Sequence, residues 1–397
     1  MEAGKLISGL AKQYLEEIIR IRRHLHRYPE LSMQEHNTAS FITDLLSDWG
    51  IPFRSGIAGT GIVALIQGEK GQGKTIALRA DMDALPIQEE NEAEYRSLNP
   101  GVMHACGHDA HMASLLGCMK ILNQIKHSFC GEVRCIFQPS EEKFPGGASL
   151  MIQEGVLENP PPSAIFGQHT LPSLEAGKIG MKAGKYMAST DEIYLTVRGV
   201  GGHAATPELL VDPVLIAAHI LVALQQIVSR HARSDIPSVL SFGHLEAAGR
   251  TNIIPSEVKI SGTFRTFDEQ WREKAHTRIT RMAESIAGGM GGSCEVHIEK
   301  GYPFLVNDEE LTGRAIRFAR EYLGEDKVVL LDMRMTAEDF AYYAQLVPAC
   351  FYRLGTADVS RGITSNLHTP SFDIDEKALE TGMGLMAWLA YCELCSD

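Results

Sequence analysis

The chain has 397 residues and a formal net charge of −13, and its hydrophobic and charged fractions are those of a soluble globular protein. The length is large for a single hydrophobic core, so we expect two domains. The negative charge argues against nucleic acid or an anionic membrane as a partner. Residues 1–13 are too polar for a signal peptide, no apolar run approaches transmembrane length, and the eight cysteines form no paired framework. A cytoplasmic protein with reduced thiols is therefore expected.

The first part of the chain alternates short apolar strands with helices. The strands are expected at 61–67, 75–79, 132–137 and 164–167, and the helices at 5–26, 34–48 and 112–125. This alternation predicts an α/β fold, with a mainly parallel sheet and helices on both faces. In such sheets, ligands bind beyond the carboxyl ends of the strands. The polar residues that follow these strand ends are Asp81, Asp83, Glu141, Glu142 and His169.

From about residue 185 the pattern changes. Strands are expected at 192–198, 238–246, 257–267 and 294–300, and helices at 211–230 and 269–290. The order β-α-β-β-α-β is that of a ferredoxin-like unit. We therefore predict an inserted domain at 185–300 within a discontinuous catalytic, metal-binding domain of residues 1–184 and 301–397. The α/β pattern resumes after the insertion, with helices at 309–322 and 376–394 and a strand at 350–354.

Residues 103–111, Met-His-Ala-Cys-Gly-His-Asp-Ala-His, contain one thiol and three imidazoles. Thiolate and neutral imidazole are ligands that zinc, manganese and cobalt sites accept. Gly107 would leave room for a metal close to the backbone. The cluster predicts a metal site at the start of a helix; the alternative is a polar loop whose histidines are satisfied by the protein.

The adjacent carboxylates Glu141 and Glu142 end a strand that looks buried. Neighbouring positions there point in different directions, so one side chain can bind a metal while the other takes a proton from an attacking water. The alternative is a solvated acidic turn. The further ligand types at loop ends, His169 and His368, favour the metal site.

Six motifs occur in an order that resembles the amidohydrolase branch of the aminoacylase/carboxypeptidase metallopeptidase family. They are R-A-D-M-D-A-L-P-I (79–87), H-A-C-G-H-D-A-H (104–111), Q-P-S-E-E (138–142), G-Q-H (167–169), G-G-H-A-A-x-P (201–207) and L-H-T-P-x-F (367–372). The branch includes N-acyl-L-amino acid amidohydrolases, hippurate hydrolases and auxin-conjugate hydrolases. The resemblance covers essentially the whole chain, including the inserted domain.

The resemblance implies two divalent metal ions, Mn²⁺ or Zn²⁺, with Co²⁺ and Ni²⁺ as alternatives. Their implied ligands are Cys106, His108, Glu142, His169 and His368. Cys106 would bridge the ions, Glu142 and His368 would complete one site, and His108 and His169 the other. Glu141 would be the general base, and Asp83 would orient a metal-binding histidine.

One position departs from the family's peptidases, which carry a histidine ligand where this chain has Asp81. Whether Asp81 contacts metal is left open. His104 and His111 are expected to pack behind the ligands rather than to bind metal.

For the inserted domain, the resemblance implies a lid that also forms a homodimer. His203, after two glycines, would reach over the active site and polarise the scissile carbonyl, unless it only caps its own loop. Asn252 would help to bind the substrate. Arg265 would either hold a substrate carboxylate or form a salt bridge within its own domain.

The predicted reaction is cleavage of the acyl–nitrogen bond of N-acyl L-amino acids, acetyl, benzoyl or similar, by a metal-activated water. The alternatives are a dipeptidase of the same family and a catalytically inactive protein that binds acyl amino acids. The residues of the sequence leave open the acyl group, the amino acid and the native metal.

Overall fold

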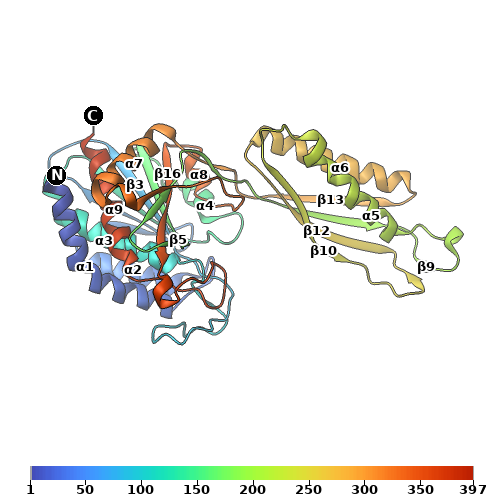
Figure 1. The fold of residues 1–397 in the computed structure, drawn as a ribbon, viewed down its shortest axis with the longest axis horizontal. Coiled ribbons are helices and arrows are strands. Elements are labelled where there is room, and N and C mark those ends of the chain that lie inside the picture. The colour runs from blue at the N-terminus through green and yellow to red at the C-terminus, as the bar shows by residue number, and fades with distance from the viewer. Residues whose placement is uncertain (1, 397) are drawn as a thin grey trace. The chain divides into compact units, whose positions relative to one another are not determined.

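The computed structural model describes residues 2–396. The chain forms two compact units (Figure 1), and each is described by itself. Unit 1 comprises Met1–Tyr186, Val306–Met333 and Asp339–Asp397, and unit 2 comprises Met187–Leu305 and Arg334–Glu338. The short segment Arg334–Glu338 belongs to unit 2, although the sequence analysis placed it in the catalytic domain.

Unit 1 is built on an eight-stranded sheet with the order β1-β2-β4-β3-β5-β16-β6-β15. Its strands are β1 (Phe53–Ile57), β2 (Gly61–Gln67), β3 (Thr75–Asp81), β4 (Glu132–Gln138), β5 (Ala164–Glu175), β6 (Ile179–Met181), β15 (Val328–Leu330) and β16 (Ala349–Ala357). The central strands β4, β3, β5 and β16 pair in parallel, and β1, β2 and β6 add antiparallel pairings. This confirms the predicted α/β class with a mainly parallel sheet.

Helices cover this sheet in layers. They are α1 (Glu2–Arg27), α2 (His36–Asp48), α3 (His108–Gln124), α4 (Gly147–Gln153), α7 (Glu309–Leu323), α8 (Ala341–Ala344) and α9 (Ala378–Cys395). α3 and α9 pack on β3 and on each other, and α1 packs on both of them from outside (Figure 1). α3 and α9 are therefore enclosed and buried on nearly every side, whereas the outer helix α1 is amphipathic.

A second helical layer consists of α4 and α8, which pack on each other and on β4 and β16.

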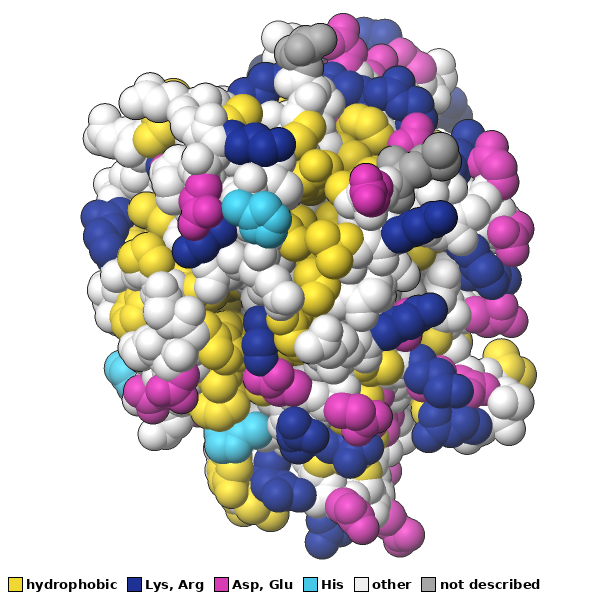
Figure 2. Space-filling view, turned by 90° about the vertical axis from the view of Figure 1, so that its left-hand side faces the viewer, with side chains coloured by type: hydrophobic (Ala, Val, Ile, Leu, Met, Phe, Trp, Pro, Cys, Tyr) yellow, Lys and Arg dark blue, Asp and Glu magenta, His cyan; other side chains and the backbone are white. Residues whose placement is uncertain are grey.

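The face of the molecule in Figure 2 carries interspersed acidic and basic side chains. Among the described side chains of that face there is no extended basic patch of the kind that nucleic acid requires.

Unit 2 has the predicted β-α-β-β-α-β order. Its elements are β8 (Asp191–Arg198), α5 (Pro213–Leu224), β10 (Ser238–Glu246), β12 (Glu257–Thr266), α6 (Glu269–Gly289) and β13 (Ser293–Lys300). The strands form an antiparallel sheet in the order β10-β12-β8-β13. Alternate residues of β8, from Ile193 to Val197, are buried in the core that this sheet forms with α5 and α6. Unit 2 also contains the short pair of β9 (Gly202–His203) with β11 (Ile253–Ile254). A second short pair, of β7 (Gly184–Met187) with β14 (Leu305–Asn307), belongs mostly to unit 1.

The expectation that no apolar run approaches transmembrane length was wrong. The helical stretch Pro213–His231 has 19 residues and a mean hydropathy of 1.4, which suffices in length and composition for a membrane span. In the structure one face of α5, including Ile216 and Ile220, is buried in unit 2. Val214, Leu215 and Val222 on the same helix are exposed.

Candidate metal centre and active site

The predicted site residues of unit 1 meet at the carboxyl ends of its parallel strands. Asp81 ends β3, and the turn with Glu141 and Glu142 follows β4. His169 lies within β5, because this strand continues beyond the predicted end at residue 167. The remaining candidates are Cys106 and His108 at the start of α3 and His368 in the loop between β16 and α9.

The predicted metal ligands form two groups that share Cys106. One is Cys106, His108 and His169, and the other is Cys106, Glu142 and His368; within each, the ligand atoms lie within 4.8 Å of one another. Cys106 Sγ lies 3.4 Å from both His169 Nε2 and His368 Nε2. His368 Nε2 lies 3.4 Å from Glu142 Oε1. The grouping is the one that the resemblance implied, and the binding of metal by these residues stays a prediction.

These separations suit ions placed between the ligand atoms. With Zn–S near 2.3 Å and Zn–N or Zn–O near 2.1 Å, a tetrahedral ion separates S from N by about 3.6 Å and N from O by about 3.4 Å. His108 Nε2 and Glu142 Oε1 are buried and make no hydrogen bond among the described residues. Buried polar atoms without partners are rare in folded proteins. The donor set therefore fits two divalent cations.

The charges around the cluster also favour cations. Burial lowers the pKa of His108, but the carboxylates of Asp81, Asp83 and Glu142 outweigh it and raise this pKa to about 10. Burial, reinforced by nearby carboxylates, raises the pKa of the Cys106 thiol well above its usual value. The shift of His108 reports nearby negative charge that a bound cation would offset, and the shift of Cys106 reports mainly burial, to which the same carboxylates add.

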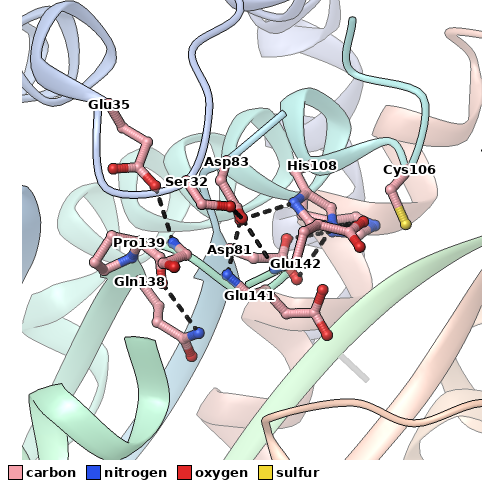
Figure 3. A network of polar contacts seen from close by, with 12 residues as sticks. Ser32, Glu35, Asp81, Asp83, Cys106, His108, Gln138, Pro139, Glu141 and Glu142 are labelled. Carbon is pink, nitrogen blue, oxygen red and sulfur yellow. Dashed lines mark hydrogen bonds and ion pairs between the residues drawn. The ribbon is translucent and has the colours of Figure 1, made fainter. Parts of the chain in front are cut away.

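Asp83 contacts both His108, at the start of α3, and the turn of residues 140–142, which we call the acidic turn (Figure 3). Its Oδ1 lies 3.4 Å from His108 Nδ1, as expected for a residue that orients this imidazole. The same carboxylate accepts hydrogen bonds from the backbone N–H groups of Glu141 and Glu142, at 3.0 and 2.9 Å, and from Ser32 Oγ at 2.6 Å. Although burial opposes it, the contact with His108, followed by the hydrogen bonds from Ser32 and the Glu142 N–H, lowers the pKa of Asp83.

Asp81 and His111 form a chain of hydrogen bonds behind the ligands. Arg79 Nη1 donates to Asp81 Oδ2, and His111 Nδ1 lies 2.6 Å from Asp81 Oδ1. The backbone N–H of Thr170 donates to His111 Nε2 at 2.8 Å, so the ring proton must reside on Nδ1 and point to Asp81. Both nitrogens of His111 and both oxygens of Asp81 thus have protein partners. His104 is also buried, and burial lowers its pKa to about 3.

Gly107 occupies a backbone position that favours glycine. It is the N-cap of α3 with φ +82° and ψ 20°, in the left-handed region. A Cβ on it would lie 2.8 Å from Cγ2 and Oγ1 of Thr170. The close protein neighbour of this backbone is therefore the side chain of Thr170, and the room that Gly107 leaves for a metal stays a prediction.

The three candidates of unit 2 lie in different settings. His203, in β9, is exposed, and its Nδ1 accepts the N–H of Ala205 at 3.1 Å, which is the loop-capping contact considered above. Asn252 accepts the N–H of Ala204 through its carbonyl. Arg265 Nη1 donates to the carbonyl of Met335 at 3.0 Å, and burial lowers its pKa. Among the described residues Arg265 has no carboxylate partner, so the salt bridge alternative was wrong.

Four residues that support the site were not among the candidates predicted from the sequence: Ser32, Glu35, Arg79 and Thr170. Arg79 opens the motif at 79–87 and Thr170 directly follows the motif at 167–169, so their positions close to Asp81 and His169 could have identified them. Ser32 and Glu35 lie in a polar stretch before a helix, which carries no comparable signal.

Comparisons with known proteins agree with this geometry. Peptidase family M20/M25/M40 matches residues 77–391. The chain is 41% identical to the putative amidohydrolase YhaA of Bacillus subtilis, over 98% of this chain and 96% of YhaA. It is 42% identical to an N-acyl-L-amino acid amidohydrolase of Geobacillus stearothermophilus, over 77% of this chain and 81% of that one. The solved structure of Bacillus subtilis YXEP, described as a dinuclear metal binding peptidase from the M20 family, superposes with a TM-score of 0.82 at 36% identity, covering 96% of this chain and 99% of that chain. The chain therefore belongs to peptidase family M20/M25/M40 and is a hydrolase of its amidohydrolase branch.

Proposed function

We propose that this hydrolase cleaves the acyl–nitrogen bond of N-acyl L-amino acids with the help of two divalent metal ions. The observation that carries the proposal is the pair of ligand groups that share Cys106, with Glu141 beside them. The similarity to an N-acyl-L-amino acid amidohydrolase supports the substrate class. Mn²⁺ or Zn²⁺ held by the five ligands would polarise the scissile carbonyl and acidify the attacking water.

The two neighbouring glutamates take different roles in this proposal. Glu142 lies beside His368 and acts as a ligand. Glu141 is 7% exposed, and its side chain leaves the turn in a different direction from that of Glu142 (Figure 3). Glu141 takes the proton from the attacking water and delivers it to the departing amine. Glu141 also lies within ligand distance of His108 and Glu142, so the metal content of Glu141→Gln distinguishes a base from a ligand at this position.

Unit 2 supplies the remaining roles. His203 polarises the substrate carbonyl, and Asn252 binds the substrate end. Arg265, a guanidinium with one donor on a backbone carbonyl, keeps further donors for a substrate carboxylate. The exposed apolar side chains of α5 support a homodimer through unit 2, because a helix that is apolar on all sides is stable in water only when it is covered.

A substrate and metal panel tests the function. The protein is stripped with a chelator, reloaded separately with Mn²⁺, Co²⁺, Ni²⁺ or Zn²⁺, and assayed for amino acid release from acetyl- and benzoyl-L-amino acids beside dipeptides. We expect turnover of the N-acyl amino acids. Faster turnover of dipeptides would favour the dipeptidase, and bound metal without any turnover would favour the binding protein.

A further inference from the structure

The loop between α1 and α2 reaches the acidic turn of the site. Within it, the side chain of Glu35 is fully buried. Its Oε1 accepts the backbone N–H groups of Ser140 at 2.9 Å and Met33 at 3.0 Å, and its Oε2 accepts Thr60 Oγ1 at 2.7 Å. Glu35 is the N-cap residue of α2 but makes no side-chain hydrogen bond to that helix. Helix capping therefore does not explain why this carboxylate is buried.

The turn that Glu35 contacts is strained and held at three successive positions. Ser140 has φ +53°, a conformation that non-glycine residues adopt only where the surroundings impose it. Glu35 binds the N–H of Ser140, and Asp83 binds those of Glu141 and Glu142 (Figure 3). Ser32, from the same loop as Glu35, donates a hydrogen bond to Asp83. The loop between α1 and α2 therefore contacts Ser140 through Glu35 and Asp83 through Ser32.

We propose that Glu35 is a positioning residue for the reaction, which through Ser140 sets where the turn places Glu141 and Glu142. The inference rests on the proposed function, because it assumes that these two glutamates are base and ligand. A base and a ligand both act only within a narrow geometry, and a misplacement of about 1 Å can reduce a rate by about a hundredfold. Glu35 itself takes no part in proton transfer or metal binding.

Two substitutions of Glu35 distinguish the effect of its hydrogen bonds from the effect of its negative charge. In Glu35→Gln, the amide oxygen can keep both backbone N–H groups, and the amide nitrogen can donate to Thr60 Oγ1, because a hydroxyl also accepts. Glu35→Ala removes every acceptor. Glu30 provides a matched control: its carboxylate also accepts N–H groups and a threonine hydroxyl at the start of α2, from Asn37 and Thr38, but it does not contact the acidic turn.

The experiment compares Glu35→Ala, Glu35→Gln and Glu30→Ala in the full-length protein. We measure kcat and KM, the number of metal ions bound per chain, and Tm. In Glu35→Ala we expect kcat to fall by about a hundredfold with KM little changed, and bound metal to fall from two ions towards one as Glu142 is displaced. Glu35→Gln should retain most of the activity and both ions. Glu30→Ala should lower Tm while keeping kcat and both ions.

Two results would overturn the inference: Glu35→Ala with the kcat and metal content of Glu30→Ala, or Glu35→Gln as inactive as Glu35→Ala. If Glu35→Ala does not fold, Thr60→Val removes only the hydroxyl that orients Oε2, and a smaller fall in kcat at unchanged KM is then required. If the unaltered protein hydrolyses no N-acyl amino acid, the proposed function fails by itself. The metal content of the variants still decides the role of Glu35.

Discussion

Replacement of Gly107 by alanine should weaken metal binding strongly. Placing a non-glycine residue at φ +82° costs roughly 1–2 kcal/mol. The new Cβ would lie 2.8 Å from two atoms of Thr170, and such overpacking costs about 1–3 kcal/mol. Thr170 cannot move away freely, because its Oγ1 donates to the Cys106 carbonyl and its N–H to His111. The strain therefore falls on the segment from Cys106 to His108.

If these roughly 2–5 kcal/mol oppose metal binding, affinity falls between about 30-fold and several thousandfold. A competition titration with a chromophoric chelator measures this change. Gly101→Ala is the control: Gly101 has φ +76° and no atom within 4 Å of the added Cβ, so this variant carries a similar backbone cost outside the segment from Cys106 to His108 and should leave metal affinity unchanged. Adding Thr170→Ala to the Gly107 variant should recover part of the loss. Unchanged affinity in Gly107→Ala would refute the reasoning.

Three further predictions follow from the site. Glu141→Gln should lower kcat by about a hundredfold or more and keep both ions, whereas Glu142→Gln should lose an ion; the reverse pattern would exchange their roles. His108, with its pKa of about 10, and the Cys106 thiol, with its raised pKa, both hold protons at neutral pH in the metal-free protein. Metal binds their deprotonated forms, so metal affinity should rise as the pH is raised from neutral towards the pKa of His108 near 10. Calorimetry in buffers of different ionisation enthalpy should detect the released protons, and the absence of release would contradict this ligand set. His203→Ala should lower kcat far more than it raises KM, with metal content unchanged. If His203 serves a partner's site in a homodimer, mixing this variant with Glu141→Gln subunits should restore activity once subunit exchange is shown, and no recovery would argue against action in trans.

The periodicity of the sequence predicted the long elements because burial dominates them. The strand expected at 61–67 is β2, and the helix expected at 269–290 is α6 apart from its last residue. β6 and β15 were missed because three residues are too few to show a pattern. α3 begins at His108 rather than at 112. Its first turn contains the buried polar residues His108, Asp109 and His111, which an apolar periodicity cannot identify as helical.

The site residues that could be predicted from the sequence are those with metal-binding or acid–base side chains close together, as in 103–111 and 141–142. The grouping around Cys106 needed the family resemblance, because nothing in the spacing of residues brings His368 next to Glu142. Glu35 could not be predicted, because a glutamate at a helix start is ordinarily solvated. Its burial depends on the approach of the turn after β4, which lies about a hundred residues further along the chain.

The order in which the chain is synthesised has a consequence for assembly of the centre. β5 pairs in parallel with β16, but all the main strands of unit 2 are made between them. The strands and helices of unit 2 are contiguous, so this unit can fold while unit 1 still lacks β16 and α9. Until β16 emerges, the edge of β5 that pairs with it is unpaired, and an unpaired apolar strand edge is prone to aggregate. His368 is made later still, so the group of Cys106, Glu142 and His368 is completed after the group of Cys106, His108 and His169.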